Sequence, residues 1–246
     1  MISNMVTAWP TGSGKVLDDS AVVVDVEERL RPWVTAIGTQ SFTGERFVHA
    51  PDAATTLVVC TASEGAFVVG PRDRARYTTG PAARRTVVRL APGRAQAVLD
   101  VPVDELVDRV VPLSEVWGRP VGDVAALRSA LLDRLASTDP ERSDLVHAAV
   151  RLLRTRGVAD TARALGTSER HLRTVFTRAV GLSPKRYARV DRVRRVVARG
   201  GRGGWARLAA ELGYYDQSHL SREFRATMGV PPGAYLAGDL PAATYC

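Results

Sequence analysis

The chain has 246 residues, of which 45% are hydrophobic and 24% are charged, and its formal net charge is +8. This composition is typical of a folded globular protein and excludes wholesale disorder, and no apolar run reaches the ~18 residues that a membrane-spanning helix needs. The first residues lack the basic and apolar segments of a secretion signal, so we expect the protein to act in the cytoplasm.

The positive charge is concentrated toward the end of the chain. Residues 141–246 hold 19 of the 34 Lys and Arg residues but only 9 of the 26 Asp and Glu residues. A general preference for arginine explains the type of cation but not this clustering, and a basic module commonly binds the phosphate backbone of a nucleic acid. At about 150 residues per domain, the length suggests two domains. We place them at residues 1–140 and 141–246, with the boundary near Pro140 in a stretch of Ser, Thr, Asp and Pro.

Short Val- and Thr-rich runs alternate with Gly, Pro and Asp in the first hundred residues. They lie at residues 21–26, 32–38, 45–51, 55–60, 65–73 and 84–93. Runs of this kind between turn residues are typical of antiparallel strands, so we predict a β sandwich or barrel.

Apolar residues then follow at helical spacing, at residues 104–110 and 122–136. In the second of these helices the apolar side chains form a stripe, made of Val124, Leu127, Leu131 and Leu135. The stripe needs a cover, which is either the sheet of the same chain or the same helix of a second chain.

Beyond the boundary the sequence predicts helices alone. Ser143 is placed to cap a helix through residues 146–156 that Gly157 ends. A helix-turn-helix pair follows, in which Gly166 lies in the turn and Ser168 caps the second helix. The pair Ser183 and Pro184 then opens a helix of about 16 residues, ~24 Å long, that the glycine cluster at 200–204 ends.

The same order of features occurs a second time in residues 205–229. Each copy has a helix of small residues, a Leu-Gly turn, a capping residue and a second helix with apolar residues four apart. Ser168 and Asp216 are the two capping residues, and the segments VGLSPKRY and MGVPPGAY follow the two copies. A repeat of this size is far harder to obtain by chance than one motif. The predicted fold class is therefore α+β, with an antiparallel sandwich- or barrel-like N-terminal domain carrying helices, followed by an all-α domain of two helix-turn-helix units joined by a long helix.

These motifs resemble those of the AraC/XylS-type transcription regulators. The segment LAAELGYYDQSHLSREFRATMGVPPGAY is very close to that family's signature, and ALGTSERHLRTVFTRAVGLSPKRY is close to it. The resemblance covers residues 143–236 and implies a sequence-specific DNA-binding regulator whose two recognition helices enter successive major grooves, about 34 Å apart. The segment APGRAQAVLDVPVDELVDRVVPLSEVWG resembles the end of a less characterised N-terminal domain that precedes such DNA-binding domains, and it names no ligand.

The resemblance also implies which side chains meet DNA. The residues expected over base edges are Arg170, Arg173, Thr174, Gln217, Ser218, Ser221 and Arg222. The residues expected at phosphates are Arg178, Lys185, Arg186 and Arg225. The simpler alternative for each arginine is a solvated surface charge, whereas Leu172, Phe176, Leu220, Phe224, Tyr187 and Tyr235 are expected in the core.

Two positions depart from the family pattern. Thr174 stands where a longer cation is common, so we expect the first unit to contact fewer bases or to rely on Arg173. Thr161 stands where an apolar residue is usual, so we expect that helix pair to pack less firmly.

The residues offer little support for catalysis, and we predict no catalytic residue, no metal and no cofactor. His49 is the only histidine before Pro140, and His147, His171 and His219 lie on separate predicted helices, which makes a poor metal site. The sequence also lacks a phosphate-binding loop and a nucleophile elbow. His49, Cys60, Trp33, Phe67 and Arg72 are candidates to line a pocket in the N-terminal domain, although core or rim positions are the simpler interpretation.

Three functions therefore stay open. The first is a regulator that responds to a small molecule through its N-terminal domain, and the second is a ligand-independent regulator whose N-terminal domain only contacts proteins. The third is a DNA-directed alkyl-transfer enzyme, which would need an activated thiolate, and Cys60 has no basic neighbour in sequence. Double-stranded DNA, RNA polymerase, a small-molecule effector and a second copy of the chain are the candidate partners, and the sequence does not distinguish an activator from a repressor.

Overall fold

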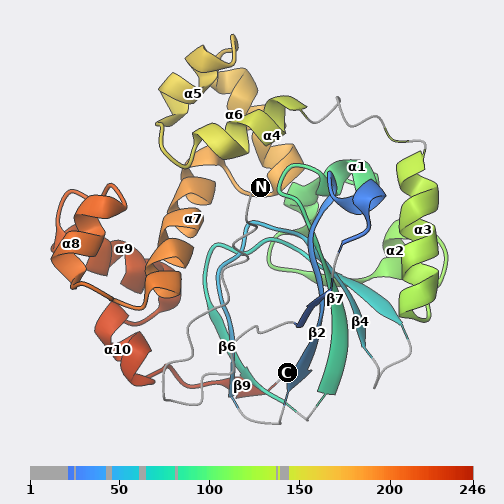
Figure 1. The fold of residues 1–246 in the computed structure, drawn as a ribbon, viewed down its shortest axis with the longest axis horizontal. Coiled ribbons are helices and arrows are strands. Elements are labelled where there is room, and N and C mark those ends of the chain that lie inside the picture. The colour runs from blue at the N-terminus through green and yellow to red at the C-terminus, as the bar shows by residue number, and fades with distance from the viewer. Residues whose placement is uncertain are drawn as a thin grey trace.

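The computed structural model describes residues 22–245 except residues 25, 43–45, 61–64, 81–82, 137 and 139–143. The predicted boundary at Pro140 and the predicted cap Ser143 lie outside the described residues. On either side of them, a part rich in strands ends at residue 136 and an all-helical part begins at residue 144 (Figure 1). No helix in the described part of the chain has the length and apolar character needed to cross a lipid bilayer.

Two sheets form the framework of the N-terminal part. The larger sheet has the strand order β1 (Val22–Val24), β2 (Val34–Phe42), β7 (Ala83–Leu90), β4 (Thr56–Cys60), β5 (Ala66–Val69) and β8 (Val110–Pro112), with all neighbours antiparallel. The smaller sheet pairs β3 (Arg46–His49) with β6 (Arg76–Thr79), and β9 (Thr244–Tyr245), from the far end of the chain, joins β6 in parallel. All six predicted runs contain a strand, and the two sheets of the described residues do not close into a barrel.

One predicted helix in this part is wrong. Residues 104–110 form only a single 3-10 turn, Val103–Leu106, and Val110 then begins strand β8. Asp108 adopts a left-handed conformation with φ of 60°, so a right-handed helix cannot continue through this residue. The apolar spacing that indicated a helix instead places Val103 and Leu106 in the core.

Helices cover one face of the larger sheet. Alternate residues of β4 and β7, such as Leu57 and Val88, point into a core that they share with α1 (Ala95–Leu99), α2 (Leu113–Trp117) and α3 (Val124–Ala136). Leu127 and Leu131 of α3 are 1% exposed. The apolar stripe of α3 is therefore covered by its own chain from Leu127 onward, whereas Val124 is 43% exposed. The opposite face of β7, with Arg85, Val87 and Arg89, points toward the smaller sheet.

The all-helical part contains the predicted repeat. Its elements are α4 (Asp144–Leu152), α5 (Val158–Ala164), α6 (Glu169–Val180), α7 (Pro184–Arg199), α8 (Trp205–Glu211), α9 (Gln217–Met228) and α10 (Pro232–Ala237). The connecting helix α7 has 16 residues and lies between the two units (Figure 1). Helix α4 ends at Leu152, earlier than predicted, and Gly157 instead caps the start of α5.

The hydrophobic cores do not follow the predicted division into two domains. Each helix-turn-helix unit has its own cluster of buried side chains, and the two clusters share no residue. The cluster of the first unit includes Ala53 and packs against Val107 of the N-terminal part, and that of the second unit packs against Val48 and Ala75. The N-terminal part therefore completes the core of each unit.

Candidate DNA-binding surface

The two predicted recognition helices, α6 and α9, begin and end in the same way. The Ser168 hydroxyl accepts a hydrogen bond from the backbone N–H of His171 at 3.1 Å, and the Asp216 carboxylate accepts one from His219 at 2.6 Å. Each helix has 12 residues and is followed by a glycine with φ of 83°. These caps satisfy N–H groups that a helix start leaves without partners, so each helix is sharply bounded.

The inner faces of α6 and α9 also correspond. Leu172 and Phe176 are fully buried in the first unit, as are Leu220 and Phe224 in the second. Phe176 meets Tyr187 edge to face at 5.4 Å between ring centroids, and Phe224 meets Tyr235 at 5.8 Å. The prediction that these six residues belong to the core is confirmed, because none of them is more than 9% exposed.

The outer faces carry the residues expected at DNA. The expected base-contacting residues Arg170, Arg173, Thr174, Gln217, Ser218 and Arg222 are exposed, and Ser221 is half-buried. The expected phosphate-contacting residues Arg178, Lys185, Arg186 and Arg225 are also exposed. Both outer faces are therefore open to solvent in the same conformation. Contact of any of these side chains with DNA stays a prediction.

The two outer faces differ in how strongly their polar groups are engaged within the protein. In α6 the Arg173 guanidinium pairs with Glu169 at 2.8 Å, and the Thr174 hydroxyl donates to the Arg170 carbonyl at 3.0 Å. In α9 the side chains of Gln217 and Arg222 have no such partner among the described residues. The engagement of Arg173 could have been found in the sequence, because Glu and Arg four positions apart meet on one helix face.

A bidentate ion pair holds α9 against the connecting helix. Arg192 of α7 donates to both carboxylate oxygens of Glu223, at 3.1 and 2.9 Å, and the Glu223 side chain is only 13% exposed. The same guanidinium lies 5.1 Å from the centroid of the Tyr214 ring. Bidentate pairs of this kind fix geometry as well as adding energy. They orient the outer face of α9 relative to α7.

The two departures from the family pattern have structural correlates. Thr161 is 0% exposed, and its hydroxyl has no hydrogen-bond partner among the described residues. A buried hydroxyl without a partner costs about 1–3 kcal/mol. The second unit also holds one, at Thr227, so weaker packing of the first unit stays a prediction. Thr174 turns its hydroxyl back onto its own helix, so the shorter side chain is also partly occupied.

Among the candidate pocket residues of the N-terminal part, Trp33 lies apart from His49 and Arg72, which are near each other. Trp33 lies in the core on the helix-covered face, whereas His49 lies in the smaller sheet with its Nε2 2.9 Å from the Thr78 hydroxyl. Burial, and then the cations of Arg72, Arg85 and Arg76, lower the pKa of His49 to about 4. The described residues contain no group of three metal-ligating side chains.

Sequence analysis missed one neighbour of Cys60. In the pairing of β4 with β7, Arg85 lies directly opposite Cys60, and the Arg85 side chain donates to Gln40 at 2.8 Å. The two residues are 25 positions apart, and only the strand register brings them together. Phe67 and Arg72, like Cys60, are half-buried.

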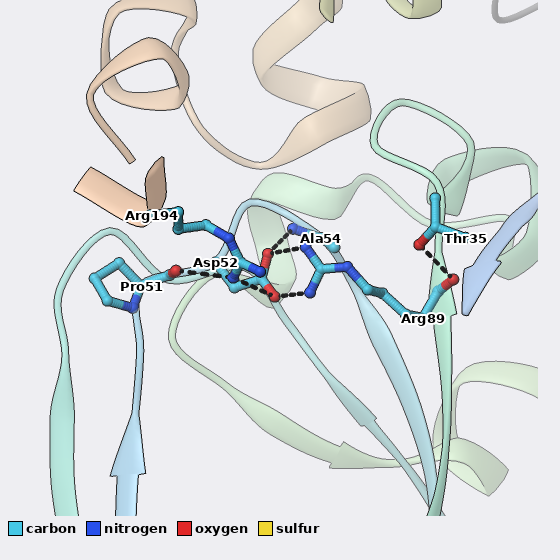
Figure 2. A network of polar contacts seen from close by, with 6 residues as sticks. All are labelled: Thr35, Pro51, Asp52, Ala54, Arg89 and Arg194. Atoms are coloured by element: carbon cyan, nitrogen blue, oxygen red, sulfur yellow. Dashed lines mark hydrogen bonds and ion pairs between the residues drawn. The ribbon is translucent and has the colours of Figure 1, made fainter. Parts of the chain in front are cut away.

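A charged cluster joins the connecting helix to the N-terminal part, and it was not predicted. The Asp52 carboxylate lies between two guanidinium groups, from Arg194 of α7 and Arg89 of β7 (Figure 2). Arg194 is 3.0 Å from Oδ2, Arg89 donates to Oδ1 at 2.6 Å, and the Ala54 N–H donates to Oδ1 at 2.9 Å. Burial alone would raise the pKa of Asp52, but the two arginines outweigh it and lower that pKa to about 2.

A comparison with known protein families identifies a helix-turn-helix domain in this chain. Residues 161–238, from α5 to the end of α10, match a protein-family model described as a helix-turn-helix domain. No curated protein matches the chain significantly in sequence.

Three solved structures are similar to parts of the chain. The C-terminal domain of AraT, a response regulator from Geobacillus stearothermophilus, is 19% identical with a TM-score of 0.38, over 41% of this chain and 89% of that one. ToxT from Vibrio cholerae O395 is 11% identical with a TM-score of 0.42, over 82% of this chain and 97% of that one. The same ToxT bound to (E)-4-(8-methylnaphthalen-1-yl)but-3-enoic acid is 12% identical with a TM-score of 0.42, over 82% and 98%.

Proposed function

Because residues 161–238 form a helix-turn-helix domain of the AraC type, we propose that the protein is a transcription regulator that binds specific sequences of duplex DNA. The observation that carries the proposal is the tandem pair of capped helices, α6 and α9, whose outer faces are open to solvent at the same time. We propose that it acts where the chromosomal DNA lies, in the cytoplasm.

In the proposed mode of binding, α6 and α9 enter neighbouring major grooves on one face of the duplex. Arginine side chains suit the O6 and N7 atoms of guanine, and Gln217 suits the N6 and N7 atoms of adenine. The cations at Arg178, Lys185 and Arg225 then neutralise phosphates and fix the position of the protein along the duplex. Because α9 has fewer internal partners on its outer face, we propose that the second unit contributes more of the discrimination between sequences.

Replacement of Arg222 by alanine tests this mode of binding. We expect a loss of about 1–3 kcal/mol in binding to the cognate site, which is roughly fivefold to 150-fold in the dissociation constant, because a bidentate contact with a base is removed. Binding to random DNA should change much less, and Arg128→Ala, on α3 of the N-terminal part, is the matched control. Fluorescence anisotropy with both DNAs at one fixed salt concentration measures the effect. Equal losses on cognate and random DNA would mean that Arg222 touches phosphate.

We also propose that the N-terminal domain responds to an anionic small molecule bound between its two sheets. Gln40 and Thr78 are only 8% and 9% exposed, so polar groups are buried where two sheets usually meet through apolar side chains. The cations of Arg72, Arg85 and Arg76 lie near enough to His49 to lower its pKa. This surrounding favours a carboxylate or a phosphate over a neutral ligand.

A thermal-shift series tests this response. Small carboxylates and phosphates are compared with neutral analogues of the same shape. A ligand that binds only the native fold raises the stability of the protein, by about 2.7 kcal/mol when the ligand concentration is a hundred times the dissociation constant. Arg85→Gln should abolish the shift. If no anion of the series shifts the melting temperature, the ligand-independent regulator becomes the better proposal.

The proposal contains no catalytic step and needs no cofactor. Alkyl transfer through Cys60 stays an alternative. Loss of a DNA-repair activity on the substitution Cys60→Ala would support it. Contact with RNA polymerase and pairing with a second copy of the chain are further proposals. Selection of bound fragments from a random oligonucleotide pool tests the pairing of two copies, because a symmetric site indicates two protomers.

A further inference from the structure

We propose that the N-terminal domain sets the distance and angle between the two recognition helices, through one segment, residues 70–77, that holds the C-terminal ends of both. This segment links β5 to β6 and includes the start of β6. We refer to it as the bridging segment. The inference rests on the proposed DNA-binding function and concerns which spacing of half-sites the protein accepts.

The first anchor of the bridging segment is the end of α6. Gly181, which follows α6, packs so closely against Pro71 that a Cβ atom there would lie 2.9 Å from the proline ring. The same Cβ would lie 3.0 Å from the Val103 carbonyl oxygen. Two residues further along the segment, Asp73 pairs with Arg186 in the first turn of α7 at 3.5 Å. The junction between α6 and α7 is therefore held by backbone contact and by charge.

The second anchor is the end of α9. The Ala75 N–H donates to the Thr227 carbonyl at 2.9 Å, and the Tyr77 hydroxyl donates to the Met228 carbonyl at 2.6 Å. The last carbonyls of a helix have no partner within the helix, so here the N-terminal domain supplies their donors. Tyr77 is 8% exposed, Thr227 is 2% exposed and Met228 is fully buried, so water does not compete for these bonds.

A third anchor lies between the other two, on the connecting helix. Backbone hydrogen bonds of 2.9 and 2.7 Å join Asp52 to Arg72 of the bridging segment. The Asp52 carboxylate in turn contacts Arg194 of α7 at 3.0 Å (Figure 2). The segment thus meets the DNA-binding part at the end of α6, along α7 and at the end of α9.

These anchors matter because the two units have separate cores. No residue belongs to both buried clusters, so the connecting helix and the N-terminal domain are what relate one recognition helix to the other. A single helix fixed only at its ends bends and twists more easily than one braced along its length. With the anchors in place, only one spacing of half-sites lets both helices enter their grooves without strain. A shift of one base pair turns the second half-site by about a tenth of a helical turn.

The test uses the double variant Tyr77→Phe/Asp73→Asn in the full chain. The probe is a set of duplexes that carry the two selected half-sites with one base pair added or removed between them. We expect the preference for the native spacing over the altered spacings to fall by a factor of about 3 to 10, comparable to the loss of one buried hydrogen bond. Tyr245→Phe, the same chemical change at a tyrosine that is 80% exposed, is the matched control and should keep the preference.

Each outcome separates the inference from the function on which it rests. If the wild-type chain binds no DNA selectively, the proposed function fails before the spacing can be compared. If the double variant binds all spacings more weakly by one common factor, or keeps the native preference, the bridging role is wrong. Asp73→Asn alone breaks a pair whose Arg186 side chain is 57% exposed, and so provides a milder variant should the loss of the Tyr77 hydroxyl unfold the chain.

Discussion

Replacement of Asp52 by asparagine is expected to lower the free energy of unfolding by about 3 kcal/mol. The substitution keeps the shape of the side chain but removes the negative charge between Arg89 and Arg194. The loss of one partner from a buried ion pair typically costs about 3–5 kcal/mol, and we expect the lower end because the Asp52 side chain is 19% exposed. Urea denaturation followed by circular dichroism measures the effect.

The pH dependence of stability provides an independent check on Asp52. Its pKa is lowered from 3.8 to about 2 in the folded chain, so the unfolded chain binds a proton more readily across that interval. The stability that the carboxylate contributes is therefore fully present above about pH 4 and is lost as the pH falls toward 2. The gap between wild type and Asp52→Asn should narrow over the same interval.

A matched control for Asp52 is available in the first helix-turn-helix unit. Asp160 pairs with Arg163 at 2.7 Å, but both side chains are more than half exposed. Asp160→Asn should cost less than about 1 kcal/mol, because exposed pairs contribute little. If the two variants lose equal stability, the buried position of Asp52 confers no special role.

Phe224→Ala is expected to remove the second unit from DNA binding. Phe224 is 1% exposed and meets Tyr235 edge to face, and truncation of a buried phenylalanine to alanine costs about 3–5 kcal/mol. That loss is comparable to the total stability of many domains, and it falls on a cluster that the first unit does not share. We expect α9 to lose its fixed position while α6 keeps its own.

Footprinting on the selected site measures this effect, because protection of one half-site should disappear while protection of the other stays. Phe176→Ala is the reciprocal variant and should remove protection of the other half-site. Loss of both half-sites in each variant would show that the two units fold as one body, despite their separate cores. Bulk probes of folding, such as circular dichroism, cannot distinguish these cases, whereas footprinting resolves them by position.

The elements that were predicted correctly are those with a local signal. Ser168 and Asp216 are found as caps because a cap acts on a backbone N–H three residues away. Phe176 and Phe224 are found as core because they lie four residues after another apolar residue on the same helix face. The offset of 48 positions from Ser168 to Asp216 also relates Leu172 to Leu220 and Phe176 to Phe224.

The elements that were missed depend on contacts with no local signal. Residues 104–110, which lead into strand β8, were predicted as a helix, because apolar spacing over seven residues cannot reveal the left-handed turn at Asp108. Strand β9 has two residues, and it exists only because β6 offers it an edge. Arg85 was not recognised as a neighbour of Cys60, since that contact follows from strand register.

The sequence by itself determined the two helix-turn-helix units, the helix between them, the strands of the larger sheet other than β8 and the side chains on each outer face. Only the tertiary structure decided how the N-terminal domain docks, through Asp52 and Arg194, and through Tyr77 and Met228, which are 151 positions apart. The physical reason is that caps and amphipathic faces act over three or four residues, whereas docking depends on the shape and charge of two completed surfaces. Those surfaces exist only after each part of the chain has folded.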